Sequence, residues 1–161
     1  MEENIQSEIQ FRSAMDTAVR ILTSRSHTAI ELTRKLKKRR IKPAIVEQVL
    51  TECKRLNYID DENTARFYLK ELKSKGYGRR YVRNAMRKKG LAAETIEISL
   101  EEDYSSSEER ENAEKLVEKK QSTFKREKDH RKRKSKIYRY LYSRGFSPDV
   151  ITETINKSQQ Q

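Results

Sequence analysis

The adjacent carboxylates in the stretch YIDDENTAR are the side chains of this sequence that are best suited to chemistry. Asp60 and Asp61, with Glu62 beside them, could hold a divalent cation in a metal-dependent nuclease. Such a site needs further ligands that converge from other elements, and the only histidines are His27 and His130. The alternative is that the aspartates cap a helix, where they accept hydrogen bonds from its free N–H groups and complement its dipole. Because the pair directly precedes a helical apolar pattern, we expect capping.

The remaining candidates for catalysis are few. Cys53 is the only cysteine, and it follows Val49 and Leu50 on an apolar helix face, which is typical of a buried core residue. One cysteine can form neither an internal disulfide nor a cysteine-based zinc site. The sequence contains no glycine-rich phosphate-binding loop and no G-x-S-x-G turn. We therefore expect a protein without enzymatic activity, metal or cofactor.

The charge of the chain is strongly positive and unevenly distributed. The formal net charge is +12, and a field of this sign attracts polyanions such as nucleic acid, an acidic protein surface or a lipid surface. Residues 101–118 carry eight acidic and two basic side chains, whereas residues 125–144 carry ten basic and two acidic ones. This segregation predicts a surface with two electrically different faces.

Two basic segments are candidates for contact with a polyanion. GYGRRYVRNAMRKKG places Arg79, Arg83 and Arg87 four residues apart, so they share one helix face. HRKRKSKIYRYLYSRG interleaves basic side chains with three tyrosines, a combination that suits phosphates and exposed bases. The alternative is an ordinary solvated helix face. The residues that we expect to face a polyanion are Arg79, Arg80, Arg83, Arg87, Lys88, Arg131, Arg133, Lys134 and Arg139.

The spacing of apolar residues reveals an internal repeat. One helical face is formed by Met15, Ala18, Val19 and Leu22, and it recurs 50 residues later in Ala65, Tyr68, Leu69 and Leu72. A second set recurs after 50 residues and again after a further 55. Its fifteen positions are Leu32, Leu36, Ile41, Val46 and Leu50, then Val82, Met86, Leu91, Ile96 and Leu100, then Ile137, Leu141, Phe146, Ile151 and Ile155. All fifteen are apolar, which is typical of a tandem repeat.

Each repeat predicts three short helices, and the small number of turn-forming residues, 4 Gly and 2 Pro, favours an all-α fold. The expected helices are 13–24, 27–39 and 43–56, then 61–75, 78–89 and 93–103, then 108–124, 128–144 and 148–158. They divide the chain into three units, 13–57, 58–104 and 105–158, preceded by a mobile polar arm at residues 1–12. The third unit has a longer, basic connection between its first and second helices. Tyr58 and Ile59 are expected to pack into the junction between units one and two. Because one such unit buries little area alone, we expect an elongated, curved repeat array.

These segments resemble the bacterial RecX regulators. The resemblance rests on RSHTAIELTRKLKKRRI, on VEQVLTECKRLNYIDDENTARFYLKELKSKGYGRRYVRNAMRKKGL and on KIYRYLYSRGFSPDVI, and it covers roughly residues 14–157. Its most specific parts are YIDD followed by ARFY, and the repeated step from KKG or SRG to an apolar residue. The chain departs from the family in HTAIEL, which has an extra residue, and at Arg40, where a glycine is common.

The resemblance implies a function that spacing and composition alone do not give. RecX proteins are built from tandem three-helix units and bind the RecA recombinase along the groove of its filament on single-stranded DNA. There they inhibit ATP hydrolysis, strand exchange and the co-protease activity of RecA, and they have no catalytic centre. The resemblance therefore implies a RecA filament and single-stranded DNA as partners.

Two further expectations complete this interpretation. No apolar run is long enough to span a membrane and no signal peptide is visible, so we expect a cytoplasmic protein, acting as a monomer, without a membrane partner. The alternative function is a helical nucleic-acid-binding protein that affects RecA mainly by binding DNA directly. Strongly salt-dependent binding to bare single strands would favour that alternative.

Overall fold

The computed structural model describes residues 2–158, with side chains from Ile5 onward, and every regular element among them is a helix. The helices are α1 (Glu2–Ser24), α2 (Ala29–Lys38), α3 (Pro43–Arg55), α4 (Asp61–Ser74), α5 (Arg79–Lys89), α6 (Ala93–Asp103), α7 (Ser106–Lys119), α8 (Gln121–Lys125), α9 (His130–Ser143) and α10 (Pro148–Ser158). The predicted all-α class is confirmed.

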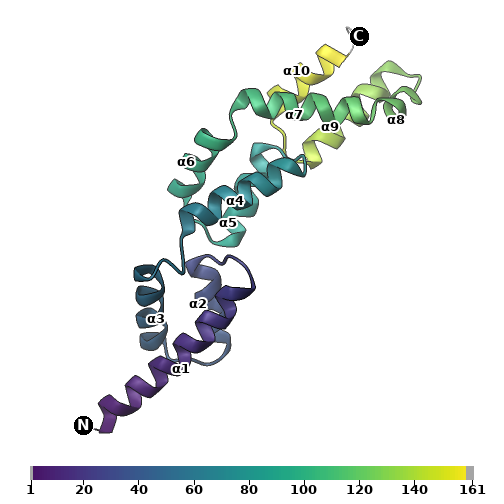
Figure 1. Cartoon of the computed structure of the whole chain (residues 1–161). Coiled ribbons are helices and arrows are strands. Elements are labelled where there is room, and N and C mark those ends of the chain that lie inside the picture. The colour runs from purple at the N-terminus through teal and green to yellow at the C-terminus, as the bar shows by residue number, and fades with distance from the viewer. Residues whose placement is uncertain (1, 159–161) are drawn as a thin grey trace.

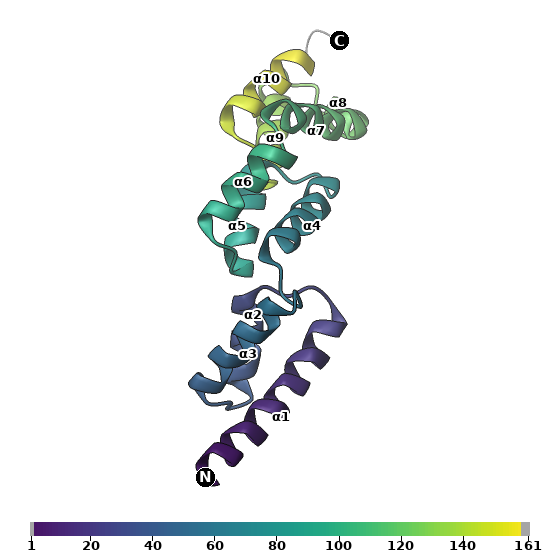
Figure 2. The ribbon, with the colours of Figure 1, turned by 60° about the vertical axis from the view of Figure 1, so that its left-hand side comes forward.

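The helices form three groups that follow one another along an elongated, curved molecule (Figure 1). Helices α1 to α3 pack on one another, as do α4 to α6 and α7 to α10, and the extensive helix packing stays within each group. The two termini lie at opposite ends of the array, and Figure 2 shows the same succession from another side. The expected elongated repeat array is therefore confirmed.

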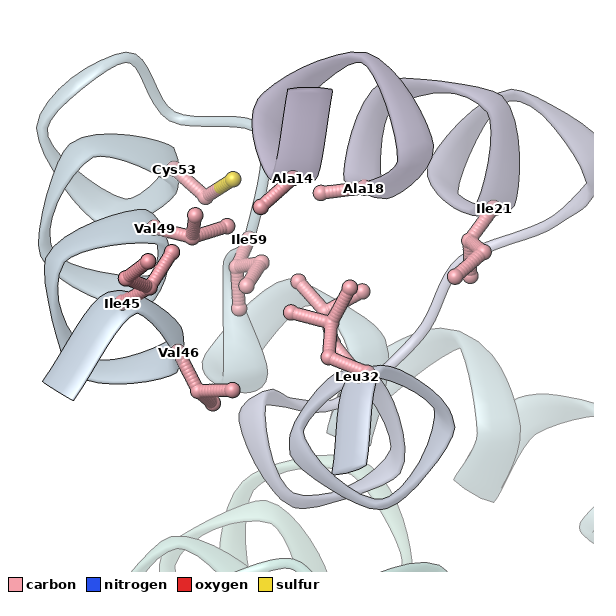
Figure 3. Close-up of a cluster of buried hydrophobic side chains, with 10 residues drawn as sticks. Ala14, Ala18, Ile21, Leu32, Ile45, Val46, Val49, Cys53 and Ile59 are labelled. Atoms are coloured by element: carbon pink, nitrogen blue, oxygen red, sulfur yellow. The ribbon is translucent and has the colours of Figure 1, made fainter. Parts of the chain in front are cut away.

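Each group of helices has its own hydrophobic core, built from the repeated apolar positions. Thirteen of the fifteen positions are buried, and the other two, Ile41 and Leu50, pack partly buried against the first core. Figure 3 shows the first core, where Ala18 of α1, Leu32 of α2 and Val49 of α3 converge around Ile59. The repeat in the sequence therefore corresponds to three separate small cores, one in each group of helices, instead of one large core.

Helix α1 differs from its prediction in length and in orientation. It begins at Glu2, so residues 2–12, which we expected to form a mobile arm, continue the helix, and Met1 lies outside the described residues. The face that α1 buries is centred on Ala14, Ala18 and Ile21, whereas Val19 is exposed. Val19 was assigned to the buried face because it lies 50 residues before Leu69, which is buried in the second core.

The connections also differ from the prediction in two places. The expected helix 108–124 is interrupted at Lys120, and the short helix α8 follows and places Phe124 in the third core. In the YIDD stretch, Ile59 is buried in the first core, but Tyr58, which we expected at the junction between units, is 52% exposed.

Candidate functional site

The two aspartates of YIDD cap two different helices. Asp60 Oδ1 accepts a hydrogen bond from the Asn63 backbone N–H at 2.9 Å, so Asp60 caps its own helix α4. Asp61 Oδ1 instead accepts the Ala29 backbone N–H at 3.0 Å, at the start of α2 in the preceding unit. The capping interpretation is confirmed, and Asp61 extends it from one helix to the contact between two units.

The third unit repeats this arrangement. Glu108 and Ser105 form a capping box at the start of α7. The next residue, Glu109, is buried, and its Oε1 accepts the Arg79 backbone N–H at 2.8 Å, at the start of α5 in the second unit. Acidic residues at matching positions therefore join successive units, because each one satisfies a free N–H at the start of a neighbouring helix.

The first joint, formed by Thr28, Ala29, Glu31, Asp61 and Lys89, connects units one and two. Thr28 Oγ1 donates a hydrogen bond to the Lys89 backbone oxygen at 2.8 Å, at the end of α5. The Lys89 Nζ also lies 3.3 Å from Glu31 Oε2 in a largely buried ion pair. The start of α2 is thus held by the first turn of α4 and the last turn of α5.

The second joint, formed by Gly78, Arg79, Glu109, Arg144 and Gly145, is made mainly of backbone. The Gly78 N–H donates to the Arg144 oxygen at 2.9 Å, and the N–H of the residue after Arg79 donates to the Gly145 oxygen at 3.1 Å. A Cβ on Gly78 would lie 2.5 Å from the Gly145 oxygen, closer than real Cβ contacts come. This close approach of two backbone segments is possible only because glycine has no side chain.

We expect Asp60→Ala and Asp61→Ala each to lower the free energy of unfolding by about 1 kcal/mol, because each removes a helix cap. Glu62→Ala is the matched control, since Glu62 is exposed and caps neither helix. Thermal unfolding of the three variants, with and without added Mg²⁺, provides the measurement. A metal site would instead show Mg²⁺-dependent stabilisation of the wild type that both aspartate variants lose.

We expect Glu109 to make the second joint sensitive to pH. Burial raises the pKa of Glu109, and the Arg79 N–H and guanidinium offset this only partly. A carboxyl with a raised pKa in the folded state contributes stability that is present below its unfolded pKa and is lost as pH rises through the folded value. As pH rises from the unfolded to the folded pKa of Glu109, the wild type should therefore lose stability relative to Glu109→Gln, whose side chain does not titrate. Thermal unfolding of both proteins across this pH range is the measurement. An unchanging difference would contradict this assignment.

Neither His27 nor Cys53 is placed for chemistry. His27 is buried, with its Nδ1 2.7 Å from the Arg25 backbone oxygen and its Nε2 2.7 Å from Lys35 Nζ. Burial lowers the pKa of His27, which favours the neutral ring that donates to Arg25 and accepts from Lys35. Burial also raises the pKa of the Cys53 thiol, which makes it a poor nucleophile. Within residues 2–158, no group of three or more metal-binding side chains is close enough to hold an ion.

The basic stripe of unit two is largely neutralised by acidic residues of α6. Arg83 donates two hydrogen bonds to the Glu97 carboxylate, at 2.6 and 2.9 Å. Arg79 has a largely buried side chain, and its Nη2 lies 3.0 Å from Glu101 Oε1. The structure thus brings Arg79 and Arg83 together, as predicted, but turns them towards a neighbouring helix. Spacing along α5 could not reveal this, because the carboxylates come from another helix.

The other three basic residues selected on α5 are placed differently. Arg87 and Lys88 are exposed in its last turn, and no ion pair involves them in the described part of the chain. Arg80 reaches across to unit three, where its Nη2 donates to the Tyr142 backbone oxygen at 2.7 Å. Its guanidinium carbon also lies 3.9 Å from the Tyr142 ring centroid, a cation–π geometry. Arg80 therefore links two units.

Unit three presents the more accessible basic surface. Arg131 and Arg139 are exposed on α9, and Lys134 is half-buried beside them. Arg133 instead donates from Nε and Nη2 to the Glu127 backbone oxygen, at 3.0 and 2.8 Å, and so holds the loop before α9. Three of the four residues selected on this helix thus remain available to a polyanion.

No helix in the described residues is long and apolar enough to cross a membrane. The helical units match known protein domains in the order in which they occur. Residues 14–53 match the first three-helix domain of RecX, residues 60–100 the second and residues 107–155 the third.

Several known proteins are similar to this chain over most of its length. A regulatory protein RecX from Deinococcus radiodurans is 34% identical, over 93% of this chain and 70% of its own length. One from Legionella pneumophila is 33% identical, over 89% of this chain and 93% of its own length. The crystal structure of RecX from Lactobacillus salivarius has the same fold, with a TM-score of 0.88 at 22% identity, over 96% of this chain and 99% of the other. The chain, with its three domains in order and relatives of this similarity, belongs to the RecX family.

Proposed function

We propose that this chain binds RecA filaments on single-stranded DNA, lies in the filament groove and inhibits the recombinase, ATPase and co-protease activities of RecA. The observation that carries the proposal is the series of three RecX domains in one extended array. A long curved molecule can contact several successive protomers of a helical polymer, whereas a compact domain of the same size would contact fewer.

The inhibition requires no chemical step. A ligand that binds one state of a filament more tightly than another shifts the equilibrium by its difference in affinity. The two joints are important here, because hydrogen bonds that fix the units relative to one another reduce the entropy lost on binding. The array therefore acts as a binding regulator. As part of the same proposal, it acts in the cytoplasm and as a monomer.

The residues selected from the sequence divide into two roles under this proposal. Arg131, Lys134 and Arg139 on α9, with Arg87 and Lys88 on α5, face the polyanion, because the structure leaves them accessible. The remaining four are positioning residues engaged within the chain, namely Arg79, Arg80, Arg83 and Arg133.

The test is a comparison of binding to RecA filaments, to RecA without DNA and to bare single strands, measured by fluorescence anisotropy of labelled chain over a range of salt concentrations. The proposal predicts that the filament is bound more tightly than either component. The charged face of α9 favours an alternative function, direct DNA binding that acts on RecA by competition. Binding to bare strands as tight as binding to filaments, with the same salt dependence, would favour that alternative and contradict the proposal.

A further inference from the structure

Two exposed tyrosines lie on the basic face of α9. Tyr138 is 37% exposed and Tyr142 is 46% exposed. Their spacing of four residues places them on the same side of the helix, and Arg131 lies seven residues before Tyr138 on that side. An aromatic pair flanked by cations is therefore presented to solvent by a helix that carries six Lys and Arg side chains and no acidic one.

The tyrosine rings form an ordered stack. The centroids of Tyr138 and Tyr142 are 5.9 Å apart, and their planes differ by 14°. Arg80 of unit two lies over the Tyr142 ring at 3.9 Å and bonds to the Tyr142 backbone oxygen. The second tyrosine thus has a ring and a guanidinium against it, which holds it in place. The first has only its fellow tyrosine as a stacking partner among the described residues.

A shallow, open hollow of about 500 Å³ adjoins Tyr138. It is lined by Lys134, Ser135, Tyr138, Arg139 and Ile155. The lining supplies an aromatic ring, an aliphatic side chain, a hydroxyl and two cations, and it contains no carboxylate. This combination suits a flat aromatic group that carries a nearby negative charge, which describes a nucleotide.

We propose that the Tyr138 hollow is a subsite for one unpaired base of single-stranded nucleic acid. The base stacks on Tyr138 and extends the stack of Tyr142 and Arg80, while Lys134 and Arg139 contact the flanking phosphates. The subsite deepens the proposed function, because it assigns the part of the chain that contacts the single strand of a filament. It makes no sequence-specific contact, since every base offers a stacking face.

The tyrosines elsewhere on the surface do not offer a comparable base-stacking site. Tyr77 and Tyr81 stack on each other at 3.9 Å in the region where units two and three meet. The Arg144 guanidinium also lies 5.5 Å from the Tyr77 ring centroid, so that pair has a structural partner. Tyr58 is exposed, but no cation–π or stacking partner supports it in the described part of the chain. Among the tyrosines in residues 5–158, Tyr138 alone combines exposure, a supported ring and a cationic hollow.

The test uses the full chain without RecA and a short oligothymidylate that carries one 2-aminopurine. We expect wild type to quench the 2-aminopurine fluorescence, because stacking on an aromatic ring does so. Tyr138→Leu should bind about tenfold more weakly and lose the quenching, whereas Tyr138→Phe should behave as wild type. Tyr138→Leu should leave the salt dependence unchanged, and Lys134→Gln should reduce its slope by about 0.7.

Two controls distinguish base stacking on Tyr138 from other effects of this surface on binding. Tyr58→Leu, which removes an exposed tyrosine far along the chain, should bind as wild type does. A duplex of equal length should be bound equally by wild type and Tyr138→Leu, because its bases are already stacked. Unchanged single-strand binding by Tyr138→Leu, or an equal loss on duplex, would overturn the subsite. If Tyr138→Leu lost only filament binding, the hollow would contact protein, and the proposed function would stand without this subsite.

Discussion

Gly145→Ala should lower the free energy of unfolding by about 3 kcal/mol or more, one of the largest effects expected for a single methyl group in this chain. Gly145 has a φ of +81°, which an alanine adopts only with strain. The added Cβ would also overlap the backbone and Cβ of Tyr81, which cannot move away as a flexible side chain can. The second joint should therefore open, as measured by thermal unfolding and by small-angle scattering of the array.

Two other glycines separate these two causes. Gly76 has a similar φ of +76°, but the atoms nearest to its Cβ would belong to the flexible side chain of Leu116, so Gly76→Ala should lose about 1 kcal/mol. Gly78 has an ordinary φ of −75°, but its Cβ would meet the backbone of Gly145 and Phe146, so Gly78→Ala isolates the steric cost at about 2 kcal/mol. If Gly145→Ala melted like Gly76→Ala, the close approach would not hold the joint.

Replacing Arg131, Lys134 and Arg139 together by glutamine should weaken binding to RecA filaments about a hundredfold near 0.1 M salt. Each phosphate contact to a single strand releases about 0.7 counterion, so the loss of three contacts removes about two decades of affinity at this salt concentration. The slope of log affinity against log salt should fall by about two. Titration of labelled chain with filaments at several salt concentrations measures both quantities.

The matched control carries the same change of net charge on another unit. Arg34, Lys37 and Lys38 are exposed on α2, and their replacement by glutamine also removes three positive charges. This control should weaken binding much less, because only the long-range field changes. Equal losses in the two triple variants would mean that net charge, and not the face of α9, determines the affinity.

The sequence was sufficient to predict the architecture because the repeat lies in residues that must be buried. Leu36, Met86 and Leu141 occupy the same position in three cores, and all three are fully buried. The helix ends at Gly90 and Gly145 were also predictable, because both glycines adopt a left-handed conformation that favours this residue. At the equivalent position in unit one, Arg40 adopts the same left-handed conformation with a φ of 60°, which is less favourable for a residue with a side chain.

The candidate site was less predictable, because its properties depend on contacts between helices. Arg79 and Arg83 form a stripe on α5, yet α6 supplies Glu97 and Glu101 to neutralise it. The acidic composition of residues 101–118 was a signal for a partner such as Glu101, but not for Glu97, which lies outside that segment. Composition also does not show which cation each carboxylate contacts. The role of Glu109 was missed for the same reason. Glu109 occupies the position in unit three that Asp61 occupies in unit two, and this match could have indicated that both make the same kind of contact.

Helix α8 and the stack of Tyr138 and Tyr142 were only weakly indicated by the sequence. Phe124 is an aromatic residue in an otherwise polar and basic connection, and its burial explains why α8 forms there. Tyr138 and Tyr142 were visible in the sequence only as two of three tyrosines that alternate with basic residues. Their support by Arg80 was not, because that side chain comes from the preceding unit.

The rate of ATP hydrolysis by RecA on single-stranded DNA, titrated with wild type and with Gly78→Ala, tests most directly whether the joined array regulates the filament. We expect wild type to slow hydrolysis at substoichiometric amounts. Gly78→Ala, with its three cores intact and its second joint opened, should require a much higher concentration. Unchanged hydrolysis in the presence of wild type, or equal inhibition by Gly78→Ala, would contradict this expectation.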